Sequence, residues 1–261
     1  MRQKQYPFLF ILAVLFVGFL TSSVYAGDEK SAETKAAKQQ DNWEFDWALY
    51  VWMPKIEGTS AGGTDFEISF SDILDNLDIT IMTTIGTRND KWSFVTDVVY
   101  LHLDHSDNSN IGSLLKLTDV YMKALVVDPF VSYEILGNEK GSLQVLAGAR
   151  FLWIDVGLDL KTRPPLPPEK IDDSGDGDVW DGVVGVRGYL TLSDRWFIPY
   201  HLDIGTGDSD KTWQAMAGVG YQFDKFKVAA TYRYLKWEFD NDYVLEDLEV
   251  YGPMVGAIFT F

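Results

Sequence analysis

Apolar and polar residues alternate with period two along most of the chain between Trp43 and Phe261. The pattern is clearest at the C-terminus. Counting back from Phe261, every second residue as far as Tyr251 is apolar or aromatic, and the residues between them are mostly small. Successive side chains of a β-strand point to opposite faces. The C-terminal stretch is therefore predicted to be a strand with one apolar face and one face of small or polar residues.

The same alternation predicts about ten strands. They fall near residues 43–51, 78–88, 92–104, 117–135, 142–160, 179–192, 196–205, 212–223, 226–239 and 248–261. Short connections near 89, 138, 194 and 224 alternate with longer ones near 65, 110, 170, 208 and 243. The face of the fourth strand is not assigned beyond Asp128-Pro129, where we expect a β-bulge because proline cannot donate to the ladder.

Aromatic residues gather at both ends of the predicted apolar face. At the ends joined by short connections these are Trp43, Trp92, Trp196, Phe223 and Phe261; at the other ends they are Trp180, Trp213 and Tyr251. A soluble β-sandwich, the alternative, buries its apolar face and has no need of two aromatic girdles. Girdles, an even strand count and alternating loop lengths are typical of transmembrane barrels. The predicted fold is all-β: an antiparallel transmembrane β-barrel of about ten strands, with short periplasmic turns and longer outer loops.

The N-terminus has the pattern of a secretory signal peptide. Arg2 and Lys4 precede an apolar run of roughly 13 residues that is too short to span a membrane as a helix. A small-x-small site ends at Ala26, so we expect cleavage there; an uncleaved membrane anchor is the alternative. The polar stretch 27–42 is predicted to be a flexible periplasmic tail. The domains expected are thus 1–26, signal peptide; 27–42, tail; and 43–261, barrel.

Charge and composition limit the partners. The chain has 22 basic and 39 acidic residues, and loss of Arg2 and Lys4 leaves 20 against 39, a net charge of −19. This acidity argues against nucleic acid as a partner. It suits outer loops facing lipopolysaccharide through bridging cations. The absence of Cys excludes disulfides and thiolate chemistry. We expect outer-membrane lipid and lipopolysaccharide as partners, a monomer, and no cofactor.

Several stretches resemble known sequences. Phe261, with Phe259 two residues earlier, resembles the C-terminal signal that the barrel-assembly machinery of Gram-negative bacteria recognises. The region from Trp43 to Phe261 resembles a group of small, functionally uncharacterised outer-membrane β-barrels. The resemblance rests on 69–78 (SFSDILDNLD), Trp92 with 96–101 (TDVVYL), 207–210 (GDSD), 212–214 (TWQ), 217–221 (AGVGY), 232–235 (YRYL) and 252–253 (GP). It implies the fold and the outer-membrane location, and it brings no catalytic residues.

The alternation also places charged residues on the lumen face, with nearly matched signs. The acidic set is Glu44, Asp46, Asp97, Asp181 and Asp203, and the basic set is Arg88, Arg150, Arg187, Lys227 and Arg233. Buried charges need partners, and small barrels fill their interiors with side chains. We therefore expect a salt-bridged ladder. An ion-conducting lumen is the alternative, which inward glycines could allow; these are Gly148, Gly185, Gly218 and Gly220.

Two further constellations could carry chemistry. His201 and Asp203 are expected on the inward face near the outer rim, where a His with carboxylates could activate water, as in ten-stranded barrel proteases of the omptin type. The expected loop 161–178 contains Asp172, Ser174, Asp176 and Asp178 at the spacing of half a calcium loop, but the bidentate Glu of such a loop is missing. We expect neither a catalytic site nor a metal site.

The long first connection contains one predicted helical segment, from Ser71 to Leu77. Ser71 is a plausible N-cap, and Ile73, Leu74 and Leu77 share one face. A short helix gains little stability alone, so this face is expected to pack against the barrel mouth and narrow it. The function expected is that of a non-enzymatic barrel with a structural or surface-interaction role through its acidic loops. A narrow channel is the alternative, and a hydrolase is a third.

Overall fold

The computed structural model describes residues 43–60, 62–105, 110–111, 115–162, 170–240 and 245–261. These belong to one unit, 42–261. The expected signal peptide and tail lie outside the described residues. No helix among the residues described is long and apolar enough to cross a membrane.

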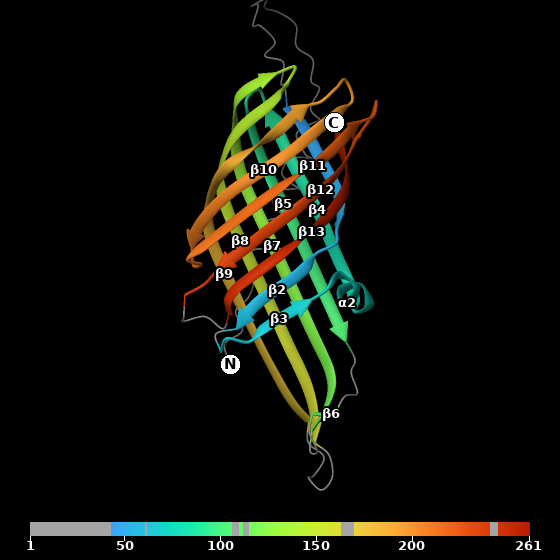
Figure 1. Cartoon of the computed structure of the whole chain (residues 1–261), viewed down its shortest axis with the longest axis vertical. Coiled ribbons are helices and arrows are strands. Elements are labelled where there is room, and N and C mark those ends of the chain that lie inside the picture. The colour runs from blue at the N-terminus through green and yellow to red at the C-terminus, as the bar shows by residue number, and fades with distance from the viewer. Residues whose placement is uncertain (1–42, 61, 106–109, 112–114, 163–169, 241–244) are drawn as a thin grey trace, which may run out of the picture. The chain divides into compact units, whose positions relative to one another are not determined.

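The described chain is almost entirely antiparallel sheet (Figure 1). Its elements are β1 (Trp43–Trp52), β2 (Lys55–Ser60), β3 (Asp65–Ile68), α2 (Phe70–Asp75), β4 (Leu77–Asn89), β5 (Trp92–His105), β6 (Asn110–Ile111), β7 (Leu115–Asn138), β8 (Gly141–Thr162), β9 (Lys170–Thr191), β10 (Trp196–Gly207), β11 (Lys211–Gln222), β12 (Lys227–Glu238) and β13 (Leu245–Thr260).

The sheet closes on itself. Each wall strand pairs with the next from β4 through β13, β1 pairs with β4, and β1 also pairs with β13, from Asp46 opposite Thr260 to Trp52 opposite Met254. Ten strands therefore form a closed wall: β1, β4, β5 and β7 to β13. The predicted ten-stranded antiparallel barrel is confirmed. We call the end with the short connections and Phe261 the turn end, and the opposite end the loop end.

Three strands run further toward the loop end than the sequence indicated. β7, β8 and β9 contain 24, 22 and 22 residues. The expectation of a loop over 161–178 is wrong, because β9 already begins at Lys170 and pairs with β8 without a register shift. Aspartate and glycine are unfavourable in strands by propensity, but ladder bonds to a regular neighbour outweigh this preference.

The bulge expected at Asp128-Pro129 is also absent. Register between β5 and β7 is continuous through Asp97 opposite Asp128 and Thr96 opposite Pro129. The irregularities of β7 lie elsewhere, at Leu117/Asp119 and at Glu134/Leu136. A proline removes one N–H donor but leaves the carbonyl, so a long strand paired on both sides can continue through it.

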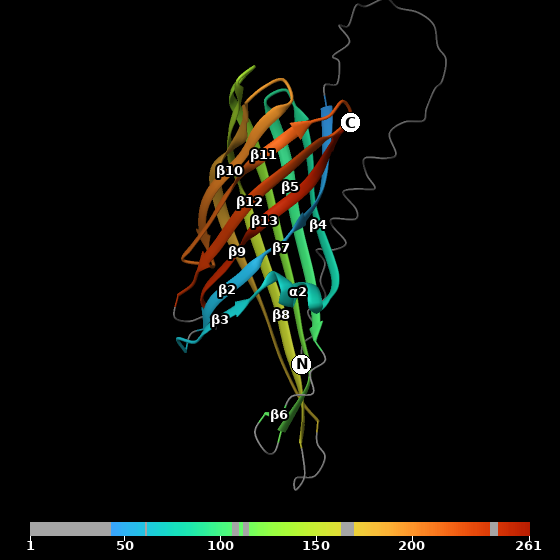
Figure 2. The ribbon, with the colours of Figure 1, turned by 45° about the vertical axis from the view of Figure 1, so that its right-hand side comes forward.

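The first connection is structured. After β1 the chain passes Pro54 and continues beside β13 as β2, which forms a hairpin with β3. β4 pairs with β1 only as far as Leu49 opposite Thr83. Figures 1 and 2 show α2 between this hairpin and the loop-end part of β4. Its N-cap is Ser69, not the expected Ser71; Ser69 and Asp72 form a capping box, and the Ser69 hydroxyl and N–H hold the pKa of Asp72 below its usual value.

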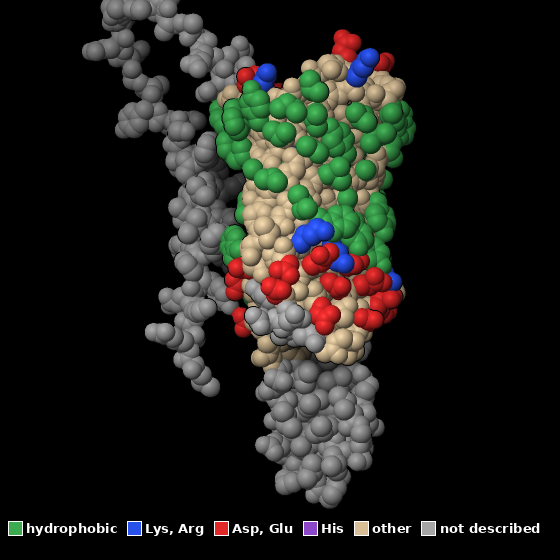
Figure 3. All heavy atoms as spheres, turned by 60° about the vertical axis from the view of Figure 1, so that its left-hand side comes forward, with side chains coloured by type: hydrophobic (Ala, Val, Ile, Leu, Met, Phe, Trp, Pro, Cys, Tyr) green, Lys and Arg blue, Asp and Glu red, His purple; other side chains and the backbone are tan. Residues whose placement is uncertain are grey.

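The outer face of the wall is apolar. Trp43, Phe45, Trp47, Leu49 and Val51 of β1 are all between 42% and 59% exposed, which gives the outward face that alternation predicted. Aromatic rings contact one another at both ends. At the turn end Trp196, Tyr221, Phe223, Phe226 and Phe259 form a chain, and at the loop end Trp213, Tyr234 and Tyr251 stack. Figure 3 shows the apolar zone, with acidic side chains gathered below it at the loop end.

Candidate functional site

Charged side chains from five strands meet inside the barrel. We call Asp97, Asp128, Arg150, Asp203 and Arg233 the mid-barrel charge cluster. They come from β5, β7, β8, β10 and β12, and the alternation of each strand turns them inward. Arg150 and Arg233 are 1% and 3% exposed and Asp128 is 4% exposed. These groups are withdrawn from water, so each charge needs a partner.

Asp128 bridges the two arginines. Arg150 Nε lies 3.1 Å from Asp128 Oδ1, and Arg150 Nη2 lies 3.0 Å from Asp203 Oδ2. Arg233 Nη1 lies 2.7 Å from Asp97 Oδ2, and its Nη2 lies 3.1 Å from Asp128 Oδ2. Forked guanidinium contacts of this kind fix geometry as well as charge. The cluster is therefore one connected network across the lumen.

Neutral groups complete the network. Arg150 donates to Thr212 Oγ1 at 3.0 Å, Arg233 Nε donates to Gln214 Oε1 at 2.7 Å, and Tyr50 donates to Asp97 Oδ1 at 2.9 Å. His201 Nε2 lies 2.6 Å from Asp203 Oδ2. These bonds leave little freedom for the charged groups to rearrange, so the network acts as a rigid cross-brace.

Sequence reasoning missed the residue at the centre of this network, Asp128. The expected bulge prevented any assignment of its face. A signal was present: the outward alternation of Leu125, Val127, Val131 and Tyr133 continues across Pro129. Treating the proline as part of a regular strand would have placed Asp128 inward.

The other predicted lumen charges do not join the cluster. Glu44 and Arg88 pair with each other at the turn end. Asp46 accepts a hydrogen bond from Thr260 at 2.6 Å. Asp181 accepts from the backbone N–H of Ser209 at 3.0 Å, near the loop end. Arg187 and Lys227 line a cavity described below. The charges thus occupy separate levels of the lumen.

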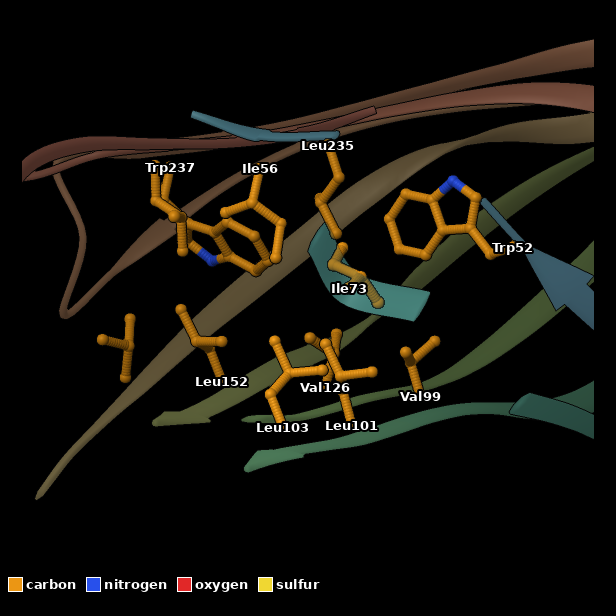
Figure 4. Close-up of a cluster of buried hydrophobic side chains, with 12 residues drawn as sticks. Trp52, Ile56, Ile73, Val99, Leu101, Leu103, Val126, Leu152, Leu235 and Trp237 are labelled. Atoms are coloured by element: carbon orange, nitrogen blue, oxygen red, sulfur yellow. The ribbon is translucent and has the colours of Figure 1, made fainter. Parts of the chain in front are cut away.

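On the loop-end side of the cluster, the lumen is filled by apolar side chains (Figure 4). This lumen apolar cluster consists of Trp52, Ile56, Ile73, Val99, Leu101, Leu103, Val126, Leu152, Val179, Leu235, Trp237 and Leu248. Ile73 enters it from α2 and is 2% exposed, whereas Leu74 is 53% exposed. Only about 50 Å³ of cavity remains among these side chains. Of the three apolar residues predicted to pack, Ile73 therefore enters the lumen filling, Leu77 packs against it from the start of β4, and Leu74 does not take part.

The two clusters contact each other. The guanidinium carbon of Arg233 lies 4.9 Å from the ring centroid of Trp52, and that of Arg150 lies 6.0 Å from Trp237. Cation–π contact of this kind stabilises a charge on an apolar surface. The arginines of the mid-barrel charge cluster thus pack directly against the tryptophans of the lumen apolar cluster.

The inward glycines do not leave the lumen open. A Cβ on Gly148 would lie 2.5 Å from Phe130 Cβ, one on Gly185 would lie 2.7 Å from Asp203 Cβ, and one on Gly220 would lie 2.2 Å from the Phe197 ring. A Cβ on Gly218 would lie 2.8 Å from Thr231 Cγ2. The nearest atom is a backbone carbonyl oxygen of the neighbouring strand at Gly148, Gly185 and Gly218, and the Phe197 ring at Gly220, so the missing side chains leave no open space at these positions.

On the turn-end side of the cluster lies a cavity of about 320 Å³, which we call the turn-end cavity. Asp97, Asp128 and Arg233 form its inner wall, and the ion-paired Arg88 lines its other end, where its side chain is 41% exposed. The cavity therefore reaches solvent at the turn end but not through the barrel.

His201 and Asp203 lie at the middle of the barrel, not at the outer rim as expected. β10 begins at Trp196 and runs to Gly207, and its neighbour β9 extends further still toward the loop end. His201 lines the turn-end cavity, and its ring packs edge-on at 5.6 Å from Phe130. The pair belongs to the structural network, because Arg150 also contacts Asp203.

The calcium-loop candidates lie in a strand. Asp172, Ser174, Asp176 and Asp178 of β9 pair opposite Asp159, Gly157, Asp155 and Trp153 of β8. An extended strand separates alternate residues by about 6.6 Å, so it cannot wrap a cation as a loop does. Among the residues described, no group of His, Asp and Glu is placed to hold a metal ion.

The C-terminal residues complete the closure of the wall. Phe261 donates its N–H to the carbonyl of Phe45 at 2.9 Å, and Phe45 donates to the carbonyl of Phe261 at 3.1 Å. The ring of Phe259 lies 6.4 Å from Trp47 and 6.0 Å from Phe226. Both residues therefore sit at the seam between the last and first strands; their role as an assembly signal stays a prediction.

Comparisons with known proteins bear on the fold. No protein-family model and no curated protein matches the sequence. The outer-membrane protease OmpT of Escherichia coli matches with a TM-score of 0.51 and 11% identity, over 85% of this chain and 98% of that one. Ail, the attachment invasion locus protein of Yersinia pestis, matches with a TM-score of 0.35 and 14% identity, over 84% and 98%. The toluene transporter TbuX of Ralstonia pickettii gives 0.37 and 13%, over 84% and 72%.

At 11% identity, the likeness to OmpT is a likeness of fold only. The chain has the fold of Gram-negative outer-membrane β-barrels.

Proposed function

We propose that this protein is a non-conducting outer-membrane barrel with a structural or surface-interaction role exerted from its loop end. The observation that carries the proposal is the filled lumen. The mid-barrel charge cluster and the lumen apolar cluster occupy successive levels of the same barrel. An ion would have to break buried ion pairs and then cross a packed apolar layer, and both steps are costly.

The proposed orientation places the turn end and both barrel termini in the periplasm. Short turns on the periplasmic side and longer connections outside are the rule in bacterial barrels. The long strands β7, β8 and β9 would then project from the cell. Their outward residues Asp176 and Asp178 are exposed, as are Asp208, Asp210 and Asp240 of neighbouring connections. Lipopolysaccharide held through divalent cations is the partner whose charge suits this surface.

An enzyme is the less favoured reading. His201 is engaged by Asp203, and Asp203 is in turn held by Arg150 and Gln214. A hydrolase needs a nucleophile or a water-activating group that faces substrate. In the described part of the chain, the imidazole forms part of a brace in the barrel interior, far from the outer surface where the sequence suggested a rim-sited hydrolase.

Conductance in planar bilayers tests the central claim. The purified full chain should give little or no single-channel current at any voltage that the membrane tolerates. A general porin inserted by the same procedure serves as the positive control, and heat-modifiable migration on a gel confirms that the inserted protein is folded. Large, stable openings from folded protein would replace this proposal with the channel alternative.

Orientation can be tested separately, because the chain has no Cys. Asp240→Cys at the loop end and Asp194→Cys at the turn end both replace exposed residues. A membrane-impermeant maleimide added to intact cells should label only the Asp240→Cys protein. Labelling of the Asp194→Cys protein alone would reverse the orientation.

The surface role predicts magnesium-dependent binding of lipopolysaccharide to the reconstituted protein. Asp176→Asn with Asp178→Asn should weaken that binding. The matched control is Asp194→Asn with Asp224→Asn, which removes the same charge from the turn end and should change nothing. Equal binding by both double variants would exclude the β9 acidic residues as the contact.

A further inference from the structure

The turn-end cavity contains a half-buried cation, Arg187, for which no ion pair is found among the residues described. Arg187 of β9 lines the cavity, and its Nη1 atom is buried without a hydrogen-bond partner among the residues described. The buried arginines of the lumen, Arg150 and Arg233, each contact two carboxylates. A guanidinium nitrogen that is buried without an acceptor is unfavourable, so Arg187 differs from its neighbours in a way that calls for a ligand.

Its surroundings hold the guanidinium in a fixed place. The guanidinium carbon lies 5.1 Å from the ring centroid of Phe130, within reach of a cation–π contact. Gln144 of β8 and His201 of β10 lie directly opposite Arg187 in register. Gln144 Oε1 accepts from Ser132, so its amide nitrogen is left to donate beside Arg187. The site is therefore a rigid set of donors.

The carboxylates around the cavity are already engaged. Asp97 and Asp128 pair with Arg233, and Asp46 accepts from Thr260. Arg88 is neutralised by Glu44. Lys227 of β12, which also lines the cavity, has no ion pair within the described part of the chain. Arg187 and Lys227 thus have no ion pair within the described part of the chain, and Asp46, which only a neutral hydroxyl contacts, is the one cavity carboxylate that no cation pairs there.

The remaining wall is largely apolar and aromatic. Tyr50, Phe197, Met216, Met254 and Ile258 line the cavity together with Phe130. A volume of about 320 Å³ lies at the lower end of the range for small-molecule pockets, which combine apolar walls with a few placed polar groups. We propose that the turn-end cavity binds a small amphipathic anion, with its carboxylate or similar acidic group on Arg187 and its apolar body against the aromatic wall.

Binding of benzoate tests the proposal, with benzamide as its uncharged counterpart and inorganic phosphate as an anion without an apolar body. The full chain in lipid nanodiscs is dialysed to equilibrium against each labelled compound. We expect saturable binding of benzoate near one per chain, and at least tenfold weaker binding of benzamide and of phosphate. No saturable benzoate binding, or phosphate binding as tight as that of benzoate, would overturn the proposal.

Variants locate the site. Arg187→Met keeps the length of the side chain but removes its charge, and it should weaken benzoate binding at least tenfold. Ala229→Trp fills the cavity while Arg187 is retained, and it should abolish binding, so the site remains testable if Arg187→Met does not fold. Arg195→Met, in an exposed turn, is the matched control and should bind normally. Unchanged binding by folded Arg187→Met or Ala229→Trp protein would contradict the assignment, whatever the conductance of the barrel.

Discussion

The two halves of the lumen are built from the same strands but are filled in opposite ways. In β12, Thr231 and Arg233 face the turn-end half, and two steps further along the same face Leu235 and Trp237 enter the loop-end half. The turn-end half keeps a cavity of about 320 Å³, whereas the loop-end half keeps about 50 Å³. The mid-barrel charge cluster separates them.

This difference shows that a barrel wall does not determine what its interior contains. Water reaches the turn-end half, so a group such as Lys227 can remain there although no ion pair is found for it among the residues described. Water is excluded from the loop-end half, so its side chains must pack against one another, and Ile73 of α2 completes the packing. The charge cluster can remain charged at the boundary because each member has a partner.

Removal of one cation from the boundary should have the largest effect. Arg150→Met leaves Asp128 and Asp203 short of a partner in a buried network, and breaking such pairs costs about 3–5 kcal/mol. Denaturant unfolding of the reconstituted barrel measures the loss. Arg88→Met, in a half-exposed pair at the turn end, is the control and should cost about 0–1 kcal/mol. Equal losses would mean that the cluster is not a distinct structural layer.

Truncation of an apolar side chain should separate the two halves directly. Leu235→Ala, at a site that is 0% exposed, should lower the free energy of unfolding by about 2–5 kcal/mol, because a cavity opens in packed surroundings. Ile258→Ala removes a side chain that already borders a cavity, so it should cost less. The same unfolding assay compares them, and a greater loss for Ile258→Ala would show that the turn-end half is the better packed.

A charge placed on either side of the wall tests which face meets lipid. Ala217 is exposed on the outer face of β11, and Ala229 of β12 lines the turn-end cavity. Arg near the midplane on the lipid face costs about 2–4 kcal/mol, so Ala217→Arg should destabilise the barrel in bilayers. Ala229→Arg enters a space that water reaches and should cost less. The opposite ranking would mean that the assigned faces are reversed.

Acid should slightly destabilise α2, the helix whose Ile73 packs into the loop-end half of the lumen. The folded-state pKa of Asp72 is lowered by its bonds to Ser69, so its contribution is complete above the ordinary carboxyl pKa and is lost as pH falls through the folded value. Limited proteolysis of the 69–76 segment should therefore quicken at low pH. In Asp72→Asn protein this particular dependence should be absent, and an unchanged pH profile would assign it to other groups.

The sequence by itself determined the wall. Period-two alternation is a local property of each strand, and it makes one face of every strand apolar, so the ten strands, the closing strand at Phe261 and both aromatic girdles could be predicted. Inward orientation of Arg150, Asp203 and Arg233 followed from the same count. None of this required knowledge of which strands face one another across the barrel.

Only the tertiary structure decided what the lumen holds. The partners of Arg150 and Arg233, the level at which His201 lies and the separation of the two halves depend on strand stagger and length, which the alternation does not encode. β9 begins at Lys170 because a regular neighbour supplies ladder bonds to a segment with poor strand propensity, and Asp128 faces inward because register is continuous through Pro129. Distances between strands far apart in sequence are set by closure of the whole sheet, and closure is a property of all ten strands together.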